Sequence, residues 1–235
     1  MEDKRYSGSQ YLENNPTWHT EHSSWKSLQI IKMLKKHNLN PTSIGEIGCG
    51  AGQVLNNLCQ RLPDNVKFHG YEISPDAFSL CQDIINPRIQ FHLKSVFEEA
   101  SLLLVFDLIL VIDVIEHIEN YLEFLKLLQF KTPNSYKLFH IPLDMNVQNI
   151  WRNYPILQLR NTVGHLHYFS KDTALESLKD SGYNIVDYVY TAGSNDLPHS
   201  MKSRILKFPR EIAFKINQDL AVRLLGGYSL LVLAK

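Results

Sequence analysis

The stretch from Ser43 to Leu55, SIGEIGCGAGQVL, constrains the fold of the chain more than any other. A short apolar run ends in the acid Glu46. Three glycines, Gly48, Gly50 and Gly52, then alternate with small residues before a helical pattern begins. Glycine lets a backbone turn sharply and lie against a ligand, and the first N–H groups of a helix have no partners inside it. The stretch therefore predicts a buried strand, a tight turn that can hold a cofactor, and a helix.

A second acid, Glu72, follows the expected strand from Lys67 to Tyr71. It comes about twenty residues after the glycines, where nucleotide-binding βαβ units place an acid that accepts hydrogen bonds from ribose hydroxyls. Its alternative role is to introduce a helix at Ser74-Pro75. The dinucleotide fingerprint itself fails, because its sixth position, which requires glycine, is Gln53.

Composition excludes several classes of protein. The 235 residues fit one domain, residues 1–235, and 24 basic residues balance 24 acidic ones, so no excess charge favours nucleic acid as a partner. The cysteines lack the spacing of a structural metal site or a disulfide framework. No apolar stretch approaches the length of a membrane span. We expect a cytoplasmic protein without stable membrane insertion, acting on a small molecule.

Strand and helix patterns alternate along the whole chain, which predicts a doubly wound α/β fold. Besides the two strands above, apolar runs predict strands at 89–93, 106–112, 135–144, 183–192 and 228–235. The run 106–112 is apolar apart from Asp107, as in a strand buried on both faces of a parallel sheet. Asp113 stands at its carboxyl end, where open α/β sheets bind ligands.

Four motifs, EIGCGAG, GYEIS, FDLILVIDVIEHI and GHLHYFS, together resemble class I S-adenosylmethionine (SAM) dependent methyltransferases, in the small-molecule branch that includes ubiquinone-type O-methyltransferases. The resemblance covers roughly residues 40–235. It implies a Rossmann-like three-layer α/β/α sandwich with a seven-stranded, mostly parallel sheet of order 3-2-1-4-5-7-6 and an antiparallel last strand. It also implies SAM as the cofactor.

By this resemblance, the glycine turn passes under the amino acid part of SAM, and residues 1–40 form an N-terminal segment and helix that covers the cofactor. For Tyr11 and Trp18 in that segment, packing and a lid over SAM remain open alternatives. The cofactor-binding residues that we expect are Tyr11, Trp18, Glu46, Gly48, Cys49, Gly50, Gly52, Glu72, Ile73, Ser95, Val96, Asp113 and Val114.

One position departs from the family pattern. Many class I methyltransferases carry an acid or amide just after the third strand to bind the adenine amino group, whereas this chain has Lys94-Ser95-Val96 there. Ser95 or the backbone of Val96 is the expected replacement.

Three histidines are candidate catalytic residues: His117, His165 and His167. His117 follows the fourth strand closely enough to accept a proton, and its ordinary pKa suits that role; a solvated helix start is the alternative. His165 and His167 alternate and should face one way on an extended segment. They would contact substrate, act as a general base or form buried hydrogen bonds. A metal site would need a third ligand, His140 or Asp144, and we expect no metal.

Residues 142–170 are the least regular part of the chain and are expected to form a substrate-side insertion. Arg152 and Arg160 in this segment would suit an anionic or glycosylated acceptor, or form structural ion pairs.

The sequence thus predicts transfer of a methyl group from SAM to an oxygen, or less favourably a nitrogen, of a small-molecule, sugar or lipid-like acceptor. The alternatives are a SAM-binding accessory protein without catalysis and a nicotinamide-dependent oxidoreductase. Acceptor identity and oligomeric state stay open.

Overall fold

Seven strands form one sheet in the computed structural model, which describes residues 20–98, 106–152, 154–193 and 201–235. The sheet order is β3-β2-β1-β4-β5-β7-β6, so the predicted order is confirmed. The strands are β1 (Ser43–Ile47), β2 (Lys67–Glu72), β3 (Ile89–Leu93), β4 (Leu108–Ile112), β5 (Tyr136–Pro142), β6 (Ile185–Thr191) and β7 (Ser229–Ala234).

The strands from β3 to β5 pair in parallel, and β7 pairs antiparallel with both β5 and β6. Every residue of β4 is buried, as the apolar run predicts for a strand covered on both faces. The antiparallel last strand is confirmed as well.

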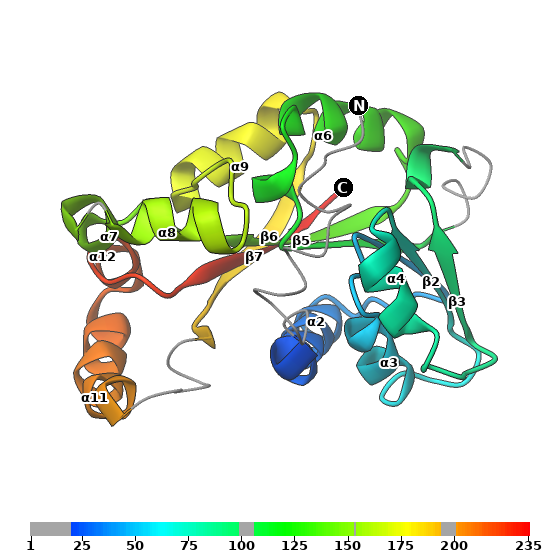
Figure 1. The fold of residues 1–235 in the computed structure, drawn as a ribbon, viewed down its shortest axis with the longest axis horizontal. Helices are drawn as coiled ribbons and strands as arrows, with labels where there is room; N and C mark the ends of the chain where they lie inside the picture. Colours follow the sequence, from blue (N-terminus) through cyan, green and yellow to red (C-terminus); the bar gives the residue numbers. More distant parts are fainter. Residues whose placement is uncertain (1–19, 99–105, 153, 194–200) are drawn as a thin grey trace.

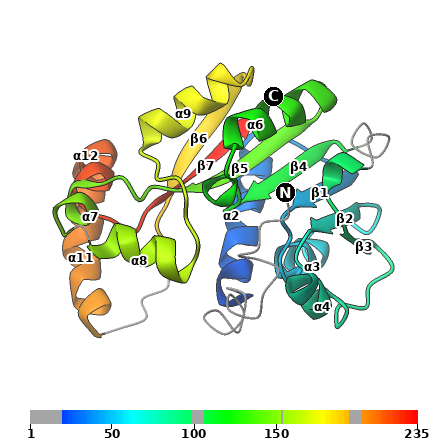
Figure 2. The ribbon, with the colours of Figure 1, turned by 45° about the horizontal axis from the view of Figure 1, so that its top comes forward.

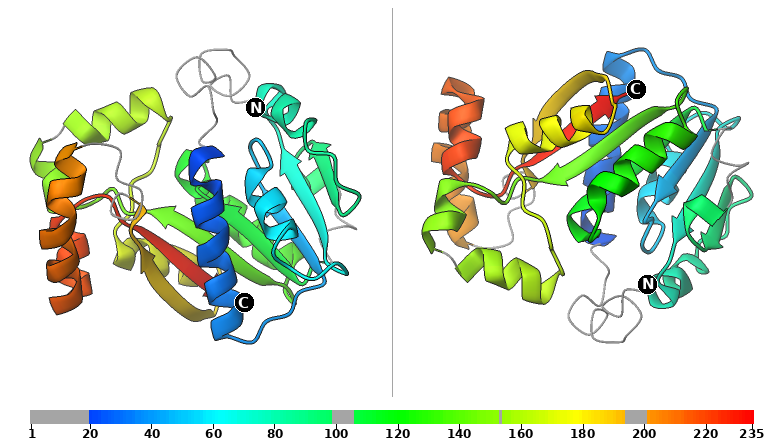
Figure 3. Two further views of the ribbon diagram at one scale, coloured as in Figure 1. Left: turned by 90° about the horizontal axis from the view of Figure 1, so that it is seen from below. Right: turned by 90° about the horizontal axis from the view of Figure 1, so that it is seen from above.

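Helices cover both faces of the sheet (Figures 1 and 3). On one face, α2 (Ser23–Lys36) and α3 (Gln53–Cys59) contribute Ile30, Met33, Leu55 and Leu58 to one buried apolar core. On the other face, α6 (Tyr121–Lys131) and α9 (Lys171–Asp180) pack onto a second core. A further helix, α4 (Pro75–Cys81), links β2 to β3. The predicted three-layer sandwich is confirmed.

Four more helices gather at one end of the sheet (Figure 2). They are α7 (Val147–Arg152), α8 (Tyr154–Thr162), α11 (Met201–Ile216) and α12 (Gln218–Leu224). The expectation of an irregular segment between β5 and α9 is therefore wrong. Asn146 accepts a hydrogen bond from the backbone N–H of Asn149 in α7, and Pro155 occupies the first turn of α8, so both helices carry ordinary start signals.

The carboxyl ends of β1 and β4 lie side by side in the middle of the sheet. From β1 the sheet continues to β2 and β3, and from β4 it continues to β5, so the chain reverses its winding direction here. Open α/β sheets bind ligands at such a switch point. No helix in the described part of the chain has the length and apolar character needed to cross a bilayer.

Candidate active site at the switch point

The glycine turn after β1 has a backbone that other residues would adopt only with strain. Gly48, Gly50 and Gly52 all have positive φ angles, of 67°, 53° and 71°. The N–H groups of Gly48 and Cys49 both donate to the carbonyl of Tyr71, at 2.8 and 3.1 Å, which ties the turn to β2. A Cβ atom on Gly48 would lie 2.8 Å from a methyl carbon of Val114. The turn is thus held tightly between β2 and the segment after β4.

Two cavities meet beside this turn. One, which we name the acidic cavity, has a volume of about 470 Å³ and carries Glu46, Asp113, Glu116 and Asp144 on its wall. The other, which we name the Glu72 cavity, has a volume of about 450 Å³. Gly48, Asp113 and His117 line both, so the cavities adjoin at these residues. The Glu72 cavity is otherwise walled by Ile47, Tyr71, Glu72, Ile73, Lys94, Ser95, Val96, Phe97, Val114, Ile118, Glu119, Asn120 and Phe124.

Glu72 is fully engaged by backbone donors. One carboxylate oxygen accepts the N–H of Gly50 at 2.9 Å, and the other accepts the N–H groups of Ile73 and Ser74, both at 2.8 Å. Burial raises the pKa of Glu72, while these N–H groups oppose the shift. Its contacts near the start of α4 match the predicted alternative of a helix-entry acid, and it also lies on the wall of the Glu72 cavity.

Glu46, at the end of β1, is only 2% exposed, and its Oε2 atom has no hydrogen-bond partner. Burial, which disfavours the charged form, raises the pKa of Glu46 well above its ordinary range, although the ammonium of Lys26 opposes the shift. A buried carboxylate oxygen without a donor is costly. In the acidic cavity it is available to a cationic or donor group of a ligand.

Asp113 is held by two partners across the sheet. Its carboxylate oxygens lie 2.6 Å from Nζ of Lys26 in α2 and 2.5 Å from Nδ1 of His140 in β5. Burial disfavours the charge on Asp113, but the attraction of His140 and Lys26 outweighs burial and holds its pKa well below the usual range. Its φ angle of 54° places a non-glycine residue in the left-handed region. Such strain at the end of a central strand is typical of functional positions.

Glu116 lies in a short 3-10 turn, Ile115–His117, directly after β4. Its side chain is fully buried, and neither carboxylate oxygen has a hydrogen-bond partner. Burial, together with the nearby charges of Asp113 and Asp144, raises the pKa of Glu116 well above its ordinary range. The predicted alternative of a solvated helix start is therefore wrong for Glu116.

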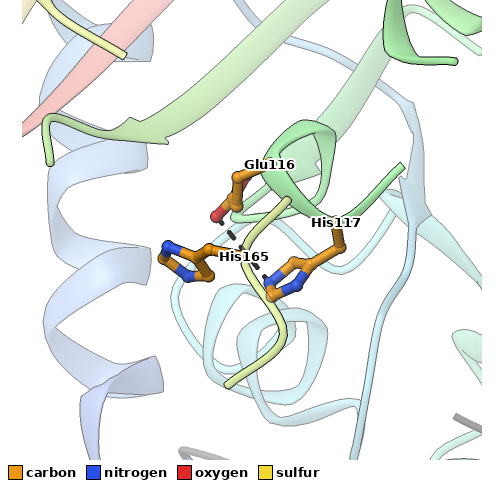
Figure 4. A group of neighbouring side chains, drawn as sticks. All are labelled: Glu116, His117 and His165. Atoms are coloured by element: carbon orange, nitrogen blue, oxygen red, sulfur yellow. Dashed lines mark ion pairs between the residues drawn. The ribbon is translucent and has the colours of Figure 1, made fainter. Parts of the chain in front are cut away.

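The backbone carbonyl of Glu116 holds the segment after α8 at the site through hydrogen bonds. It accepts the N–H groups of Leu166 and His167, at 2.8 and 3.1 Å. As a result, the ring of His165 packs edge-on against the ring of His117, with centroids 4.9 Å apart. Figure 4 shows the Glu116 carboxylate pointing toward these two rings.

The structure separates His165 from His167, which the sequence expected to face one way. His165 is buried in the acidic cavity, whereas His167 lines neither cavity and packs against Tyr121, with ring centroids 4.7 Å apart. Its Nε2 atom lies 3.1 Å from the carbonyl of Glu119. Of the three candidate catalytic histidines, the structure brings only His117 and His165 to the site.

The other predicted cofactor residues divide by cavity. Cys49 and Gly50 line the acidic cavity, whereas Ile73, Ser95, Val96 and Val114 line the Glu72 cavity. Tyr11 and Trp18 lie outside the described residues. Gly52 lines neither cavity; a Cβ atom there would lie 2.5 Å from the ring of Phe91, so its glycine serves packing.

Sequence reasoning missed Lys26. Of the described residues on the wall of the acidic cavity, Lys26 is the single lysine or arginine. Burial disfavours its charge, but the attraction of Asp113, Glu116 and Glu46 outweighs burial and raises the pKa of Lys26. A lysine on an amphipathic helix ordinarily points to solvent, so nothing in the local pattern marked it. Arg152 and Arg160, by contrast, are exposed and line neither cavity.

Comparison with known proteins indicates a methyltransferase, as the sequence motifs predict. A family model described as a methyltransferase domain matches residues 13–188, more than half of the chain. No curated protein matches the chain in sequence.

Solved structures resemble it over most of its length. A SAM-dependent methyltransferase from Archaeoglobus fulgidus is 17% identical, with a TM-score of 0.57 over 89% of this chain and 94% of that one. The magnesium protoporphyrin IX methyltransferase of Synechocystis PCC 6803, with bound S-adenosylhomocysteine (SAH), is 14% identical, with a TM-score of 0.58 over 90% and 82%. The plantazolicin methyltransferase BpumL, in complex with a triazolic desmethylPZN analog and SAH, is 20% identical, with a TM-score of 0.58 over 99% and 90%. At such identities the likeness shows a shared fold.

Proposed function

Since the chain belongs to the class I SAM-dependent methyltransferases, we propose that it methylates an oxygen of a small, uncharged or cationic acceptor held in the acidic cavity. An amine nitrogen is the second candidate acceptor atom. The observation that carries the proposal is the unpartnered carboxylate oxygen of Glu46, in the acidic cavity and beside the glycine turn.

The residues at this junction fit SAM. The Glu72 cavity combines apolar walls, such as Ile47, Val96 and Phe97, with carboxylates, Glu72 among them, which suits a nucleoside. Across Gly48, Glu46 offers a carboxylate oxygen to the ammonium of the methionine arm, and Lys26 offers an ammonium to its carboxylate. Solved structures that resemble the chain contain SAH, which supports the same assignment.

Bound SAM would supply a methyl carbon on a positively charged sulfur; an acceptor oxygen would bond to this carbon as the carbon–sulfur electron pair returned to sulfur, and the hydroxyl proton would have to leave. The chain's part is to align the acceptor and to accept or release that proton. Glu116, His117 and His165 are the cluster that faces the acidic cavity next to the junction. We assign the handling of the hydroxyl proton to this cluster.

The charge of the acidic cavity restricts the acceptor. Four carboxylates and one lysine line it, which disfavours an anionic acceptor. Leu159 of α8 and Val163, just after that helix, add apolar wall, which supports a substrate-side role for residues 142–170. Because Arg152 and Arg160 line neither cavity, they do not supply a reason to expect an anionic acceptor.

Titration calorimetry with SAH tests the cofactor site. The wild-type chain should bind SAH, and Glu46→Gln should weaken binding roughly tenfold, about 1.4 kcal/mol, because the amide has no negative charge to pair with the ammonium. Glu176→Gln is the matched control, since Glu176 lies exposed on α9, where it pairs with Lys179. No binding to the wild-type chain, or equal binding by Glu46→Gln, would contradict the assignment.

A panel of hydroxyl and amine acceptors, scored by SAH formation, tests the acceptor. Turnover with neutral hydroxyl compounds is the expected result. Turnover confined to amines would replace oxygen by nitrogen, and turnover confined to anionic compounds would overturn the charge argument.

A further inference from the structure

Glu116 is a buried acid that the protein itself does not satisfy. Both of its carboxylate oxygens are inaccessible to solvent and lack hydrogen-bond partners, although the residue lies on the wall of a cavity. Its acidic neighbours Asp113 and Asp144 make an additional negative charge there still less favourable. Buried carboxylates of this kind are normally paired or bound to a metal ion. The arrangement therefore calls for a cationic ligand.

Two histidines next to Glu116 have their Nδ1 atoms already occupied. Nδ1 of His165 lies 2.8 Å from Oδ2 of Asp144, and Nδ1 of His117 lies 3.3 Å from the carbonyl of Gly164. A carboxylate and a carbonyl can only accept, so both Nδ1 atoms donate, and the neutral rings carry a lone pair on Nε2. Support of a histidine by a carboxylate or carbonyl through one ring nitrogen is typical of metal ligands.

The three side chains converge at a spacing that one ion can bridge (Figure 4). Nε2 of His117 lies 3.9 Å from Oε1 of Glu116, and the ligand atoms of Glu116, His117 and His165 all lie within 4.8 Å of one another. Ligands bound at about 2.1 Å from one ion lie about 3.4 Å apart in tetrahedral geometry and at most about 4.2 Å apart when they are opposite. The observed separations are wider than the tetrahedral spacing, so the side chains would rotate inward to bind the ion.

The charges of the acidic cavity leave room for a cation even when SAM is bound. Its wall carries four carboxylates against one lysine. SAM brings a sulfonium together with an ammonium and a carboxylate, which is one net positive charge. A divalent cation would balance the negative charge that remains on these groups.

We propose that Glu116, His117 and His165 bind one divalent transition-metal ion in the acidic cavity, with Asp144 orienting His165. A set of two imidazoles and one carboxylate suits first-row ions such as Zn²⁺ and Mn²⁺. Three protein ligands leave a coordination position open, as in catalytic metal sites. The ion site rests on the geometry alone, and the use of its open position rests on the proposed function.

In that use, the acceptor hydroxyl binds to the ion through its oxygen, which lowers the pKa of the hydroxyl. Its proton is released to water in the open cavity, and its oxygen lone pair then forms the bond to the methyl carbon while the carbon–sulfur pair returns to sulfur. His117 acts here as a ligand in place of its predicted role as a general base. The expectation of no metal concerned His165 and His167, with His140 or Asp144 as the third ligand. In the fold, the side chains that lie together are instead Glu116, His117 and His165.

Titration calorimetry of the full chain, stripped of metal by a chelator, tests the ion site with Zn²⁺ and with Mn²⁺ separately. We expect one ion per chain. Glu116→Gln and His165→Ala should each weaken binding about 100-fold or more, and Asp144→Asn about 10- to 100-fold. His167→Ala is the control, because His167 lies outside both cavities, and it should bind like the wild-type chain.

Calorimetry with SAH on the same samples shows that each variant is folded and separates the two proposals. SAH binding without ion binding overturns the metal site and leaves the proposed function in place. Ion binding without SAH binding supports the metal site and overturns the proposed function. Equal ion affinity of wild type, Glu116→Gln and His165→Ala would place any bound ion elsewhere and would also overturn the site.

Discussion

Glu72 and Glu116 are both buried carboxylates on the walls of adjoining cavities, but the protein treats them in opposite ways. Glu72 accepts three backbone N–H groups, whereas Glu116 accepts none. Burial raises the pKa of both, and the shift is the larger for Glu116, which has acidic neighbours and no donors. A satisfied carboxylate shapes the backbone around a ligand, and an unsatisfied one depends on a ligand to balance it.

The largest expected effect is that of Glu72→Ala. Loss of three hydrogen bonds, one of them to Gly50 in the glycine turn, should lower the free energy of unfolding by about 3 kcal/mol, at about 1 kcal/mol each. SAH affinity should fall with it. Urea denaturation measures the first effect, and Glu116→Gln in the metal-free chain is the matched comparison, which should lose no stability. Equal losses in the two variants would erase the distinction between them.

Gly48→Ala tests whether the glycine turn, which Glu72 supports, can accommodate a side chain at residue 48. The positive φ of Gly48 costs an L-residue about 1–2 kcal/mol, and the new Cβ would lie 2.8 Å from a methyl carbon of Val114. We expect lower stability and weaker SAH binding. In a Val114→Ala background the steric part should disappear and the backbone part should remain. Wild-type stability of Gly48→Ala would show that the turn can relax.

The pH dependence of stability should reveal the unsatisfied acid. Because the pKa of Glu116 is raised in the folded chain, its protonated form stabilises the fold. This contribution to the free energy of unfolding is complete below the unfolded pKa of about 4.3 and is lost as pH rises through the folded pKa. Between about pH 5 and pH 8, the free energy of unfolding of the metal-free wild type should therefore fall by on the order of 1 kcal/mol more than that of Glu116→Gln. Denaturation at a series of pH values measures this. Parallel profiles would mean that Glu116 is satisfied.

The smallest effect is expected outside both cavities. Arg152→Gln and Arg160→Gln change exposed side chains, so KM for the acceptor should stay within about twofold of wild type. Steady-state kinetics with a neutral acceptor provides the measurement. A tenfold rise in KM would show that the acceptor extends over α7 or α8 and that its charge was misjudged.

Much of the fold followed from local patterns and the family resemblance. A few consecutive residues are enough to predict the glycine turn, the acid Glu72 and the buried strand before Asp113, because strand burial and turn chemistry are local properties. The helices α7 and α8 were missed, although Asn146 and Pro155 are ordinary start signals, because their apolar residues are scattered.

The acidic cavity was harder to predict because its contacts join distant parts of the chain. Lys26 forms an ion pair with Asp113, and the carbonyl of Glu116 accepts hydrogen bonds from the segment that carries His165. No spacing rule links such positions. The alternation of His165 and His167 suggested a shared direction, and hydrogen bonding to Glu116 decided otherwise.

The left-handed backbone of Asp113 limits what this position can become. Glycine and asparagine are the residues that adopt such a conformation most readily, and neither carries the negative charge that pairs with Lys26 and His140. Glutamate would keep the charge but would meet the backbone penalty and reach too far. Every replacement thus sacrifices either geometry or charge, so a randomised library at residue 113 should return aspartate almost alone among active clones.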